Sequence, residues 1–224
     1  VYNRPEEIKE LLQSMTGLRF NKKFEIVIIE DGSSVPCDDV INGFSNRINI
    51  SYYQKTNTGP GDSRNYGMEK ALGNYYLILD SDVLLPSGYL GEVDDFLSAN
   101  YFDCFGGPDA ADESFTKLQK AINYSMTSWL TTGGIRGSKK AIDKFQPRSF
   151  NMGLSKKAFE LSGGFGSIHP GEDPDLSLRL EKLGIRTTFI PGAVVYHKRR
   201  VDWNKFYEQV QKFGKVRPIL NQWH

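Results

Sequence analysis

The stretch that decides the fold of this chain is Tyr-Tyr-Leu-Ile-Leu-Asp-Ser-Asp, residues 75–82. It is short, apolar and rich in residues that favour β-structure, and turn-forming residues flank it at 73–74 and 86–88. These features predict a buried β-strand. Asp80 and Asp82 follow the apolar residues, so we expect both carboxylates at one edge of a sheet, where the strand leaves the core.

Two neighbouring carboxylates repel each other unless a cation lies between them. Carboxylate oxygens are hard ligands that suit Mg²⁺ or Mn²⁺, and such ions keep coordination positions for water and phosphate. The sequence therefore predicts a metal–diphosphate site at Asp80 and Asp82.

Helical and strand patterns alternate on both sides of this stretch. We expect helices after Pro5, over 36–45, over 63–72 and around 90–97, with strands over 24–29 and 48–53. This alternation predicts an α/β fold with a mostly parallel sheet covered by helices. Ligands of such sheets bind at the carboxyl ends of the strands. The rule gathers three polar strand ends into one crevice: residues 2–4, 31–33 and 80–82.

The regular alternation of helical and strand patterns changes after about residue 103. The pattern predicts a helix over 115–130, a strand over 150–155, a helix over 172–183, short strands over 187–190 and 194–196, and a last helix capped by Asp202. Residues 107–150 contain many glycines and lysines and only one helical pattern, so we expect them to form the variable side of the cleft.

Composition excludes several classes of protein. The 224 residues carry a formal net charge of +1, so no overall field attracts nucleic acid or an anionic membrane, and residues 198–200 form the one dense basic cluster. The two cysteines, Cys37 and Cys104, have no metal-binding spacing and favour a reducing compartment. No apolar run is long enough for a bilayer span, and no signal peptide is recognisable. We also expect the natural protein to continue beyond one or both ends, since residues 1–5 look like a strand end that runs directly into a helix.

Asp31 and Arg64 are the next candidates for chemistry. Asp31 ends a predicted strand and could accept hydrogen bonds from a ribose hydroxyl or a base N–H, although Asp-Gly is also a common turn. Arg64 follows a glycine-rich loop that opens a helix, where backbone N–H groups and a guanidinium can face an anion. The alternative for Arg64 is an exposed arginine at a helix start.

Three further residues lie in the last third of the chain. Glu172 and Asp173 begin a predicted helix, where acids are favoured by the helix dipole, and either one could instead serve as a general base. His197 follows a short apolar run and would also sit at a strand end. A structural role for His197 and a role as a metal ligand both remain open from spacing alone.

Taken in order, these motifs resemble glycosyltransferase family 2, whose catalytic domain has the GT-A fold. The resemblance runs through nearly the whole chain and is carried by an ordered set of short motifs: Val1-Tyr-Asn-Arg4, Ile29-Glu-Asp-Gly-Ser33, Asn57 to Gly67, Asp80-Ser-Asp82, Asn151-Met-Gly153, Gly163-Gly-Phe165, Gly171 to Leu176 with Arg179, and His197. Each motif is loose, but the ordered set is specific. The resemblance implies a single GT-A domain with a Rossmann-like, mostly parallel sheet.

The resemblance also implies a role for each candidate residue. Those that would contact the nucleotide-sugar are Tyr2, Arg4, Asp31, Arg64, Asp80 and Ser81. Those that would bind the metal are Asp82, Asp80 and His197. Asp173 would be the catalytic base, with Glu172 beside it. Residues 1–106 would form the donor-binding half of the domain, and residues 107–224 the half that binds the acceptor and carries the base.

The function implied by the resemblance is an inverting transfer of one hexosyl or N-acetylhexosaminyl unit from a nucleoside-diphosphate sugar to an acceptor hydroxyl. A UDP-sugar is the expected donor. Mn²⁺ or Mg²⁺ would be the cofactor. We accordingly expect a saccharide or lipid-linked acceptor and no nucleic-acid partner. We also expect a cytoplasmic location with peripheral association at the inner face of the plasma membrane. The QxxRW signature of processive relatives is absent at residues 198–203, which favours one sugar per encounter.

Other classes of protein share parts of this pattern. Residues 77–83 fit the nucleophile motif of haloacid-dehalogenase-like phosphatases, but that motif normally follows the first strand, and three segments precede it here. A sugar-nucleotide binding module without catalysis is a second alternative. A nucleotidyltransferase is a third, although the chain lacks a basic glycine-rich start.

Overall fold

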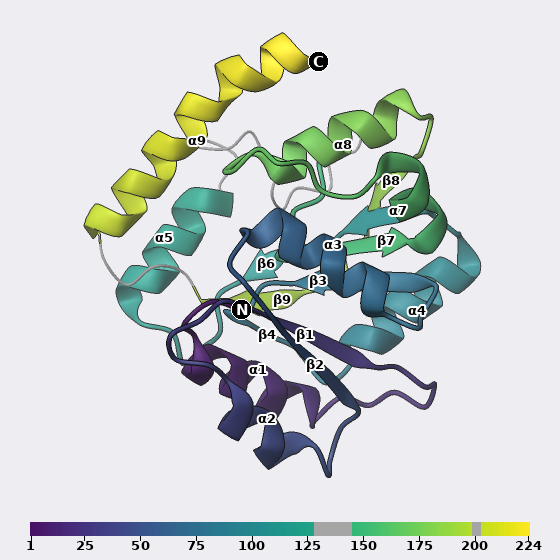
Figure 1. The fold of residues 1–224 in the computed structure, drawn as a ribbon, viewed down its shortest axis with the longest axis vertical. Coiled ribbons are helices and arrows are strands. Elements are labelled where there is room, and N and C mark those ends of the chain that lie inside the picture. The colour runs from purple at the N-terminus through teal and green to yellow at the C-terminus, as the bar shows by residue number, and fades with distance from the viewer. Residues whose placement is uncertain (128–144, 199–202) are drawn as a thin grey trace.

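The computed structural model describes residues 1–127, 145–198 and 203–224. Figure 1 shows helices packed around a set of twisted strands, with β1 and β2 on one side of the molecule and the long α9 on the other. The helices are α1 (Pro5–Met15), α2 (Asp38–Phe44), α3 (Pro60–Lys70), α4 (Tyr89–Ala99), α5 (Lys117–Thr127), α7 (Lys156–Ser162), α8 (Glu172–Lys182) and α9 (Trp203–Trp223). The strands are β1 (Ile26–Asp31), β2 (Ile50–Lys55), β3 (Tyr75–Leu79), β4 (Val83–Leu84), β5 (Cys104–Gly106), β6 (Asp109–Ala110), β7 (Asn151–Ser155), β8 (Thr187–Phe189) and β9 (Val195–His197).

The strands form three hydrogen-bonded groups. β1 pairs with β2 in parallel, with Ile26 opposite Ile50. A second group has the order β3-β7-β5-β8, and a third has the order β4-β9-β6. β7 runs antiparallel to both β3 and β5, whereas β5–β8 and β6–β9 are parallel. The expected α/β architecture is confirmed, with antiparallel pairs around β7 making the strand arrangement mixed.

The first helix shows why the local sequence folds as it does. Pro5 occupies the first turn of α1, where its missing N–H costs no hydrogen bond. The apolar residues recur at helical spacing, and the structure buries them on one face: Ile8, Leu11, Leu12 and Met15. This face joins the larger core cluster together with Ile28 and Val83. The polar start of α1 is thereby held beside the ends of β1 and β3.

The second core cluster lies under α3 and α8. It contains Met68 of α3, Ile78 of β3, Met152 of β7 and Leu176 of α8, all buried. Because α3 and α8 pack on the same strands, their N-terminal ends are brought together at the ends of those strands. This packing is what places Arg64 next to Glu172 and Asp173.

Some elements differ from the expectations. The short strands β4, β5 and β6 and the helix α7 were not predicted. The helix α7 nevertheless has a capping residue at each end: the Ser155 hydroxyl accepts a hydrogen bond from the Ala158 N–H, and Gly163 ends the helix at a φ of 71°. The last helix extends through Pro218 to Trp223, beyond the predicted Phe213. The end of the helix predicted over 115–130, the cap Asp202 and part of the basic cluster at 198–200 lie outside the described residues.

Candidate active site

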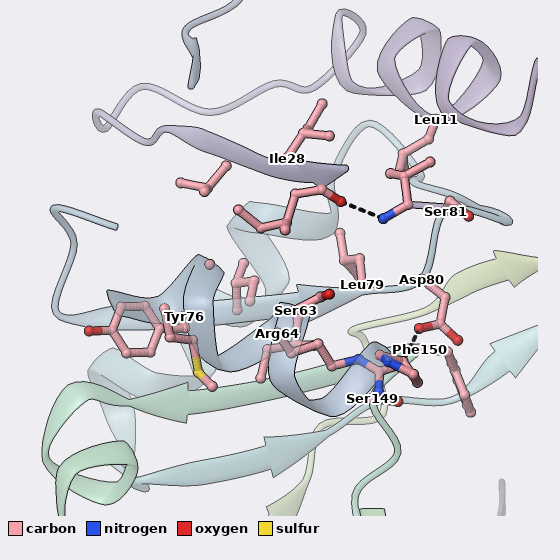
Figure 2. Close-up of a pocket in the computed structure, with 18 of the residues that line it drawn as sticks. Leu11, Ile28, Ser63, Arg64, Tyr76, Leu79, Asp80, Ser81, Ser149 and Phe150 are labelled. Carbon is pink, nitrogen blue, oxygen red and sulfur yellow. Dashed lines mark hydrogen bonds and ion pairs between the residues drawn. The ribbon is translucent and has the colours of Figure 1, made fainter. Parts of the chain in front are cut away.

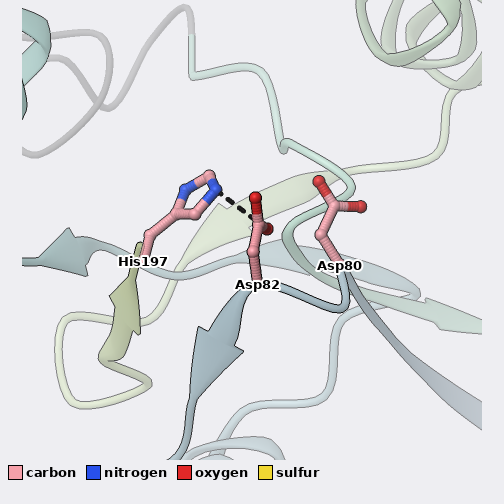
Figure 3. A group of neighbouring side chains, drawn as sticks. All are labelled: Asp80, Asp82 and His197. Atoms are coloured by element: carbon pink, nitrogen blue, oxygen red, sulfur yellow. Dashed lines mark ion pairs between the residues drawn. The ribbon is translucent and has the colours of Figure 1, made fainter. Parts of the chain in front are cut away.

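Asp80, Asp82 and His197 form the centre of the site. Asp80 and Asp82 lie in the turn between β3 and β4, and His197 ends β9, which pairs with β4 so that Val83 lies opposite His197. One ligand atom from each of the three side chains lies within 4.8 Å of the others. Figure 3 shows the three side chains pointing into one space, with His197 Nε2 3.2 Å from Asp82 Oδ1. The structure thus brings the aspartate pair that follows one predicted strand together with a histidine that the sequence placed at the end of another.

His197 is held in this orientation by two neighbours. Its ring packs against Phe150, with the ring centroids 4.9 Å apart. Its Nδ1 lies 3.8 Å from Asp109 Oδ2, on the side of the ring opposite Asp82. A carboxylate behind a ligating histidine is the usual arrangement in metal sites, because it orients the ring and raises its basicity. Sequence reasoning missed Asp109, whose one signal was an acid on a short apolar segment.

The three side chains fit a hard divalent cation. Two carboxylates and one imidazole offer oxygen and nitrogen donors close to one another, a donor set that suits Mn²⁺ or Mg²⁺. Arg4 contributes a further charge, with its Nη1 3.4 Å from Asp82 Oδ2. The arginine balances part of the negative charge of Asp82.

Arg64 links the acid cluster to the start of α8. Its Nη2 donates to Asp80 Oδ1 at 2.8 Å, and its Nη1 donates to Glu172 Oε1 at 3.3 Å. Figure 2 shows the Arg64 side chain extended along the cavity wall toward Asp80. Burial disfavours the charged guanidinium, but the carboxylates of Asp80 and Asp173 outweigh it and raise the pKa of Arg64. The arginine is therefore a permanent cation between the two acidic parts of the site.

Glu172 and Asp173 occupy adjacent positions but have different environments. Glu172 is buried, and its carboxylate accepts hydrogen bonds from the Gly171 N–H at 2.9 Å and from Arg64. His169 Nδ1 also lies 3.2 Å from it. Burial opposes ionisation of Glu172, but these hydrogen bonds and the Arg64 charge prevail and lower its pKa. Glu172 is thus an ionised anchor whose oxygens already have partners.

Asp173 has a different set of neighbours from Glu172. Its Oδ2 accepts a hydrogen bond from the Ser149 N–H at 3.1 Å, and its buried Oδ1 has no hydrogen-bond partner among the described residues. Burial raises the pKa of Asp173, although the charges of Arg64 and Arg148 act in the opposite direction. A carboxylate with a raised pKa binds a proton more readily than an ordinary one, which is what proton abstraction from a hydroxyl requires.

Asp31 accepts hydrogen bonds from the loop that precedes α3, which the sequence did not indicate. Its Oδ1 accepts hydrogen bonds from Lys55 Nζ at 2.8 Å and from the Thr58 N–H at 3.0 Å, and its Oδ2 accepts one from the Gly59 N–H at 3.0 Å. Burial alone would raise the pKa of Asp31, but the Lys55 and Thr58 hydrogen bonds lower it. Asp31 therefore organises the loop that leads into α3.

The remaining predicted residues lie around the same opening. A cavity of about 2020 Å³ is lined by Tyr2, Arg4, Asp31 and Ser81 together with the acid cluster and the start of α8. Tyr2 is 53% exposed, so its ring is available to a ligand. Arg148 also lines this cavity, and its buried Nε has no hydrogen-bond partner among the described residues. Every predicted site residue thus faces one cavity, while much of the segment 107–150, expected to bind the acceptor, lies outside the described residues.

In the part of the chain that the structure describes, no helix is both long enough and apolar enough to cross a bilayer.

The family described as "Glycosyl transferase family 2" matches residues 1–161 of the chain. Among curated proteins, the probable glycosyltransferase YdaM of Bacillus subtilis is 24% identical over 96% of this chain and 53% of its own length. The poly(ribitol-phosphate) β-N-acetylglucosaminyltransferase TarS of Staphylococcus aureus is 31% identical over 46% of this chain and 18% of its own length. The chain spans about half the length of YdaM and less of TarS.

Solved structures show the same fold. The crystal structure of S. aureus TarS 1-349 in complex with UDP-GlcNAc matches 90% of this chain and 57% of that chain, with a TM-score of 0.68 and 21% identity. The mannosyltransferase PcManGT of Pyrobaculum calidifontis, in complex with GDP-Man and Mn²⁺, matches 99% of this chain and 66% of that chain, with a TM-score of 0.71 and 16% identity. These matches establish the GT-A fold.

The family match covers more than two thirds of the chain and includes Asp80, Asp82 and Arg64. It excludes the phosphatase alternative for the motif at 77–83, because that motif belongs to an unrelated fold. Family, fold and the ordered motifs agree, and the chain belongs to glycosyl transferase family 2.

Proposed function

We propose that this domain is a metal-dependent, inverting glycosyltransferase that moves one sugar from a nucleoside-diphosphate sugar to an acceptor hydroxyl. The observation that carries the proposal is the convergence of two groups in one cavity. The Asp80–Asp82–His197 cluster provides a cation site, and Asp173 provides a carboxylate with a raised pKa whose buried Oδ1 has no hydrogen-bond partner in the described part of the chain. Arg64 connects the two groups through Asp80 and Glu172.

The chemistry of an inverting transfer needs one base and one site for the leaving group. The acceptor oxygen attacks the anomeric carbon from the face opposite the diphosphate, and the bond from that carbon to the diphosphate oxygen breaks. The acceptor proton passes to Asp173 Oδ1, and the nucleoside diphosphate leaves with the bonding electron pair. No second carboxylate is required for this reaction, so Glu172 can remain the partner of Arg64 and His169.

Asp80, Asp82 and His197 would hold Mn²⁺ or Mg²⁺ in this proposal, with Asp109 supporting His197. A bound divalent cation neutralises the negative charge that grows on a departing diphosphate. Arg4 and Arg64 are placed to add positive charge on the same side of the cavity. Asp31 and Tyr2 are the residues that we assign to binding of the nucleotide base, since both line the same cavity as the acid cluster.

The identity of the donor is also part of the proposal. A UDP-sugar, with a hexosyl or N-acetylhexosaminyl group, is supported by the structural match to a protein that binds UDP-GlcNAc. A role in cell-surface polysaccharide or glycolipid synthesis is supported by the name of TarS, which acts on a poly(ribitol phosphate). We propose a saccharide or lipid-linked acceptor and a cytoplasmic site of action, with peripheral attachment to the membrane.

Two measurements test this proposal. Calorimetry with UDP and with GDP, each with and without Mn²⁺, should show nucleotide binding that depends on the metal. Release of UDP from UDP-sugars in the presence of candidate acceptors should then identify the transfer. Metal-independent nucleotide binding would contradict the metal site, whereas metal-dependent binding with no transfer to any acceptor class would favour a sugar-nucleotide binding module.

A further inference from the structure

Arg148 is a cation of the cavity that no acid of the described chain contacts. Of the arginines that line the cavity, Arg4 and Arg64 form ion pairs with acidic side chains of the site. Arg148 lines the cavity too, but within the described ranges no hydrogen bond or ion pair joins its guanidinium to another side chain, and its Nε is buried. Burial removes the water that would solvate a cation, so buried cations are normally paired. The cavity therefore favours a ligand that brings an anion to Arg148.

The position of Arg148 links it to the proposed base and not to the cation site. The next residue, Ser149, lines the cavity in Figure 2 and donates its N–H to Asp173 Oδ2 at 3.1 Å. Burial lowers the pKa of Arg148, and the charge of Asp173 opposes this effect. Burial would also lower the pKa of Arg64, but there the charge of Asp80, an acid of the cation site, leads the groups that raise it. Arg148 thus belongs to the side of the cavity where a hydroxyl would meet Asp173.

The diphosphate of the donor is the less suitable partner for Arg148. In the proposed reaction the diphosphate lies at the cation site, where Arg4 and Arg64 supply further positive charge. Inversion brings the acceptor to the opposite face of the sugar, which is the side assigned to Asp173. Because charge interactions weaken with distance, a cation on that side acts more strongly on the acceptor than on the leaving group. The remaining anion for Arg148 is therefore one that the acceptor carries.

We propose, in an extension that rests on the proposed function, that Arg148 binds an anionic group of the acceptor. The substrate class is then a saccharide or polyol that carries a phosphate or a carboxylate near the attacked hydroxyl. The planar guanidinium can donate two parallel hydrogen bonds to two oxygens of either group. A neutral acceptor that covers Arg148 would leave the charge buried without a partner, and sites built for a polar group reject substrates that lack it.

The first experiment measures binding without transfer. UDP and Mg²⁺ are kept at saturation so that the donor side is occupied, and ligand-observed NMR titrations compare glucose 6-phosphate, glucuronate and glucose. The protein should bind each anionic probe about 10–100-fold more tightly than glucose, because a charge-assisted pair forms only with the anionic probes. The two anionic probes show whether phosphate or carboxylate is the better partner.

Three variants connect any such preference to the arginine. Arg148→Met should reduce the affinity for both anionic probes to that for glucose. Arg148→Lys keeps the charge but not the planar fork, so it should retain part of the preference. Arg47→Met is the matched control, since it removes the same charge from an exposed residue whose guanidinium lies over the Phe44 ring, and it should change none of the affinities. Thermal unfolding identifies any variant that fails to fold, and Arg148→Lys then decides alone.

The second experiment measures transfer to pairs of acceptors that differ only in the anionic group. The unmodified protein should favour the anionic member in kcat/KM by about 10–100-fold. Arg148→Met should remove this preference, chiefly through the KM of the anionic acceptor. Equal loss with both acceptors, or a rise confined to the KM of the UDP-sugar, would overturn the proposal, as would failure of both anionic probes to bind more tightly than glucose.

Failure of the proposed function has a different signature. A protein that binds no UDP in the presence of metal is not the proposed transferase, and the probe titrations are then repeated on the free protein. A preference for the anionic probes that Arg148→Met removes would support the anion site by itself. Transfer to neutral and anionic acceptors at equal kcat/KM would instead uphold the proposed function and overturn the role of Arg148.

Discussion

Arg64 Nη2 donates to Asp80 Oδ1 at 2.8 Å, and this contact joins the first acid of the Asp80–Asp82–His197 cluster to the first turns of α3. The same guanidinium reaches Glu172 at the start of α8 through its other terminal nitrogen. One cation therefore compensates acids from two distant parts of the chain. The Phe165 ring covers one face of the Arg64 guanidinium, and the Arg64 Cζ lies 5.3 Å from the ring centroid.

Replacement of Arg64 should impair both stability and transfer. Arg64→Met leaves Asp80, Glu172 and Asp173 without their shared counter-charge. The expected loss in the free energy of unfolding is about 2–3 kcal/mol, less than for a fully buried pair because Asp80 is partly exposed. Arg64→Lys retains the charge but cannot contact both acids, so it should lose less stability. Urea unfolding measures these differences.

A matched control for Arg64 is available on α8. Arg179 bonds to Asp175 at 2.7 Å and to the Gly164 carbonyl, away from the acid cluster. Arg179→Met should lose stability but retain transfer per folded molecule at temperatures well below Tm. Equal loss of transfer in the two variants would show that Arg64 acts only through folding.

Asp173→Asn should abolish most of the transfer and leave nucleotide binding intact. Loss of a general base typically costs about 10²–10⁴-fold in rate. Calorimetry with UDP and Mn²⁺, and a transfer assay on the same preparation, measure the two quantities separately. Asp175→Asn, two residues further along α8, serves as the control, because Asp175 is paired with Arg179 and should affect stability only. Transfer at a near-normal rate in Asp173→Asn would assign the base elsewhere.

Asp173→Asn should also change the pH dependence of stability. Burial raises the folded pKa of Asp173 above its unfolded value, so the folded state holds this proton more tightly. That contribution is present at low pH and is lost as the pH rises through the raised pKa. At pH 7 the variant should therefore be more stable than the original, by about 2–4 °C in Tm. The difference should vanish at acidic pH, and a constant difference across pH would contradict the raised pKa.

Arg148 should set the acidic limb of the pH–rate profile. The base works only when ionised, so the rate should fall as the pH drops through the raised pKa of Asp173. The Arg148 charge lowers that pKa, and Arg148→Met should move the acidic limb to higher pH. Arg148→Lys, which keeps the charge, should move it less. A limb that does not shift in Arg148→Met would mean that another group controls the rate.

Asp109→Asn should weaken metal binding without removing a ligand. The Asp109 carboxylate faces His197 Nδ1, and loss of such a supporting group typically costs about 10–100-fold in metal affinity. Titration of Mn²⁺ in the presence of saturating UDP measures the affinity. Asp112→Asn is the control, since Asp112 lies three positions after Asp109 and accepts hydrogen bonds from the Ser114 N–H and hydroxyl instead of facing the histidine. Unchanged Mn²⁺ affinity in Asp109→Asn would remove Asp109 from the site.

Much of the site could be predicted from sequence because its residues follow strands or begin helices. Asp80, Asp82 and His197 were placed correctly at strand ends, since short apolar runs and turn residues mark those ends locally. The environments of these residues could not be predicted. Asp109 beside His197, and the network around Asp31, arise from segments that meet only after the strands pair.

The sequence by itself determined the order of elements and the position of each acid along them, because hydrophobic periodicity and turn chemistry act over a few neighbouring residues. Only the tertiary structure decided that Glu172 is an ionised anchor and Asp173 a carboxylate with a raised pKa. Arg64, 108 residues away from Glu172, lowers the pKa of both acids, so the difference comes from the stronger desolvation of Asp173 and from the His169 and Gly171 partners of Glu172. Charge interactions and desolvation depend on what surrounds each side chain in space. Two residues that are adjacent in the sequence can have different surroundings.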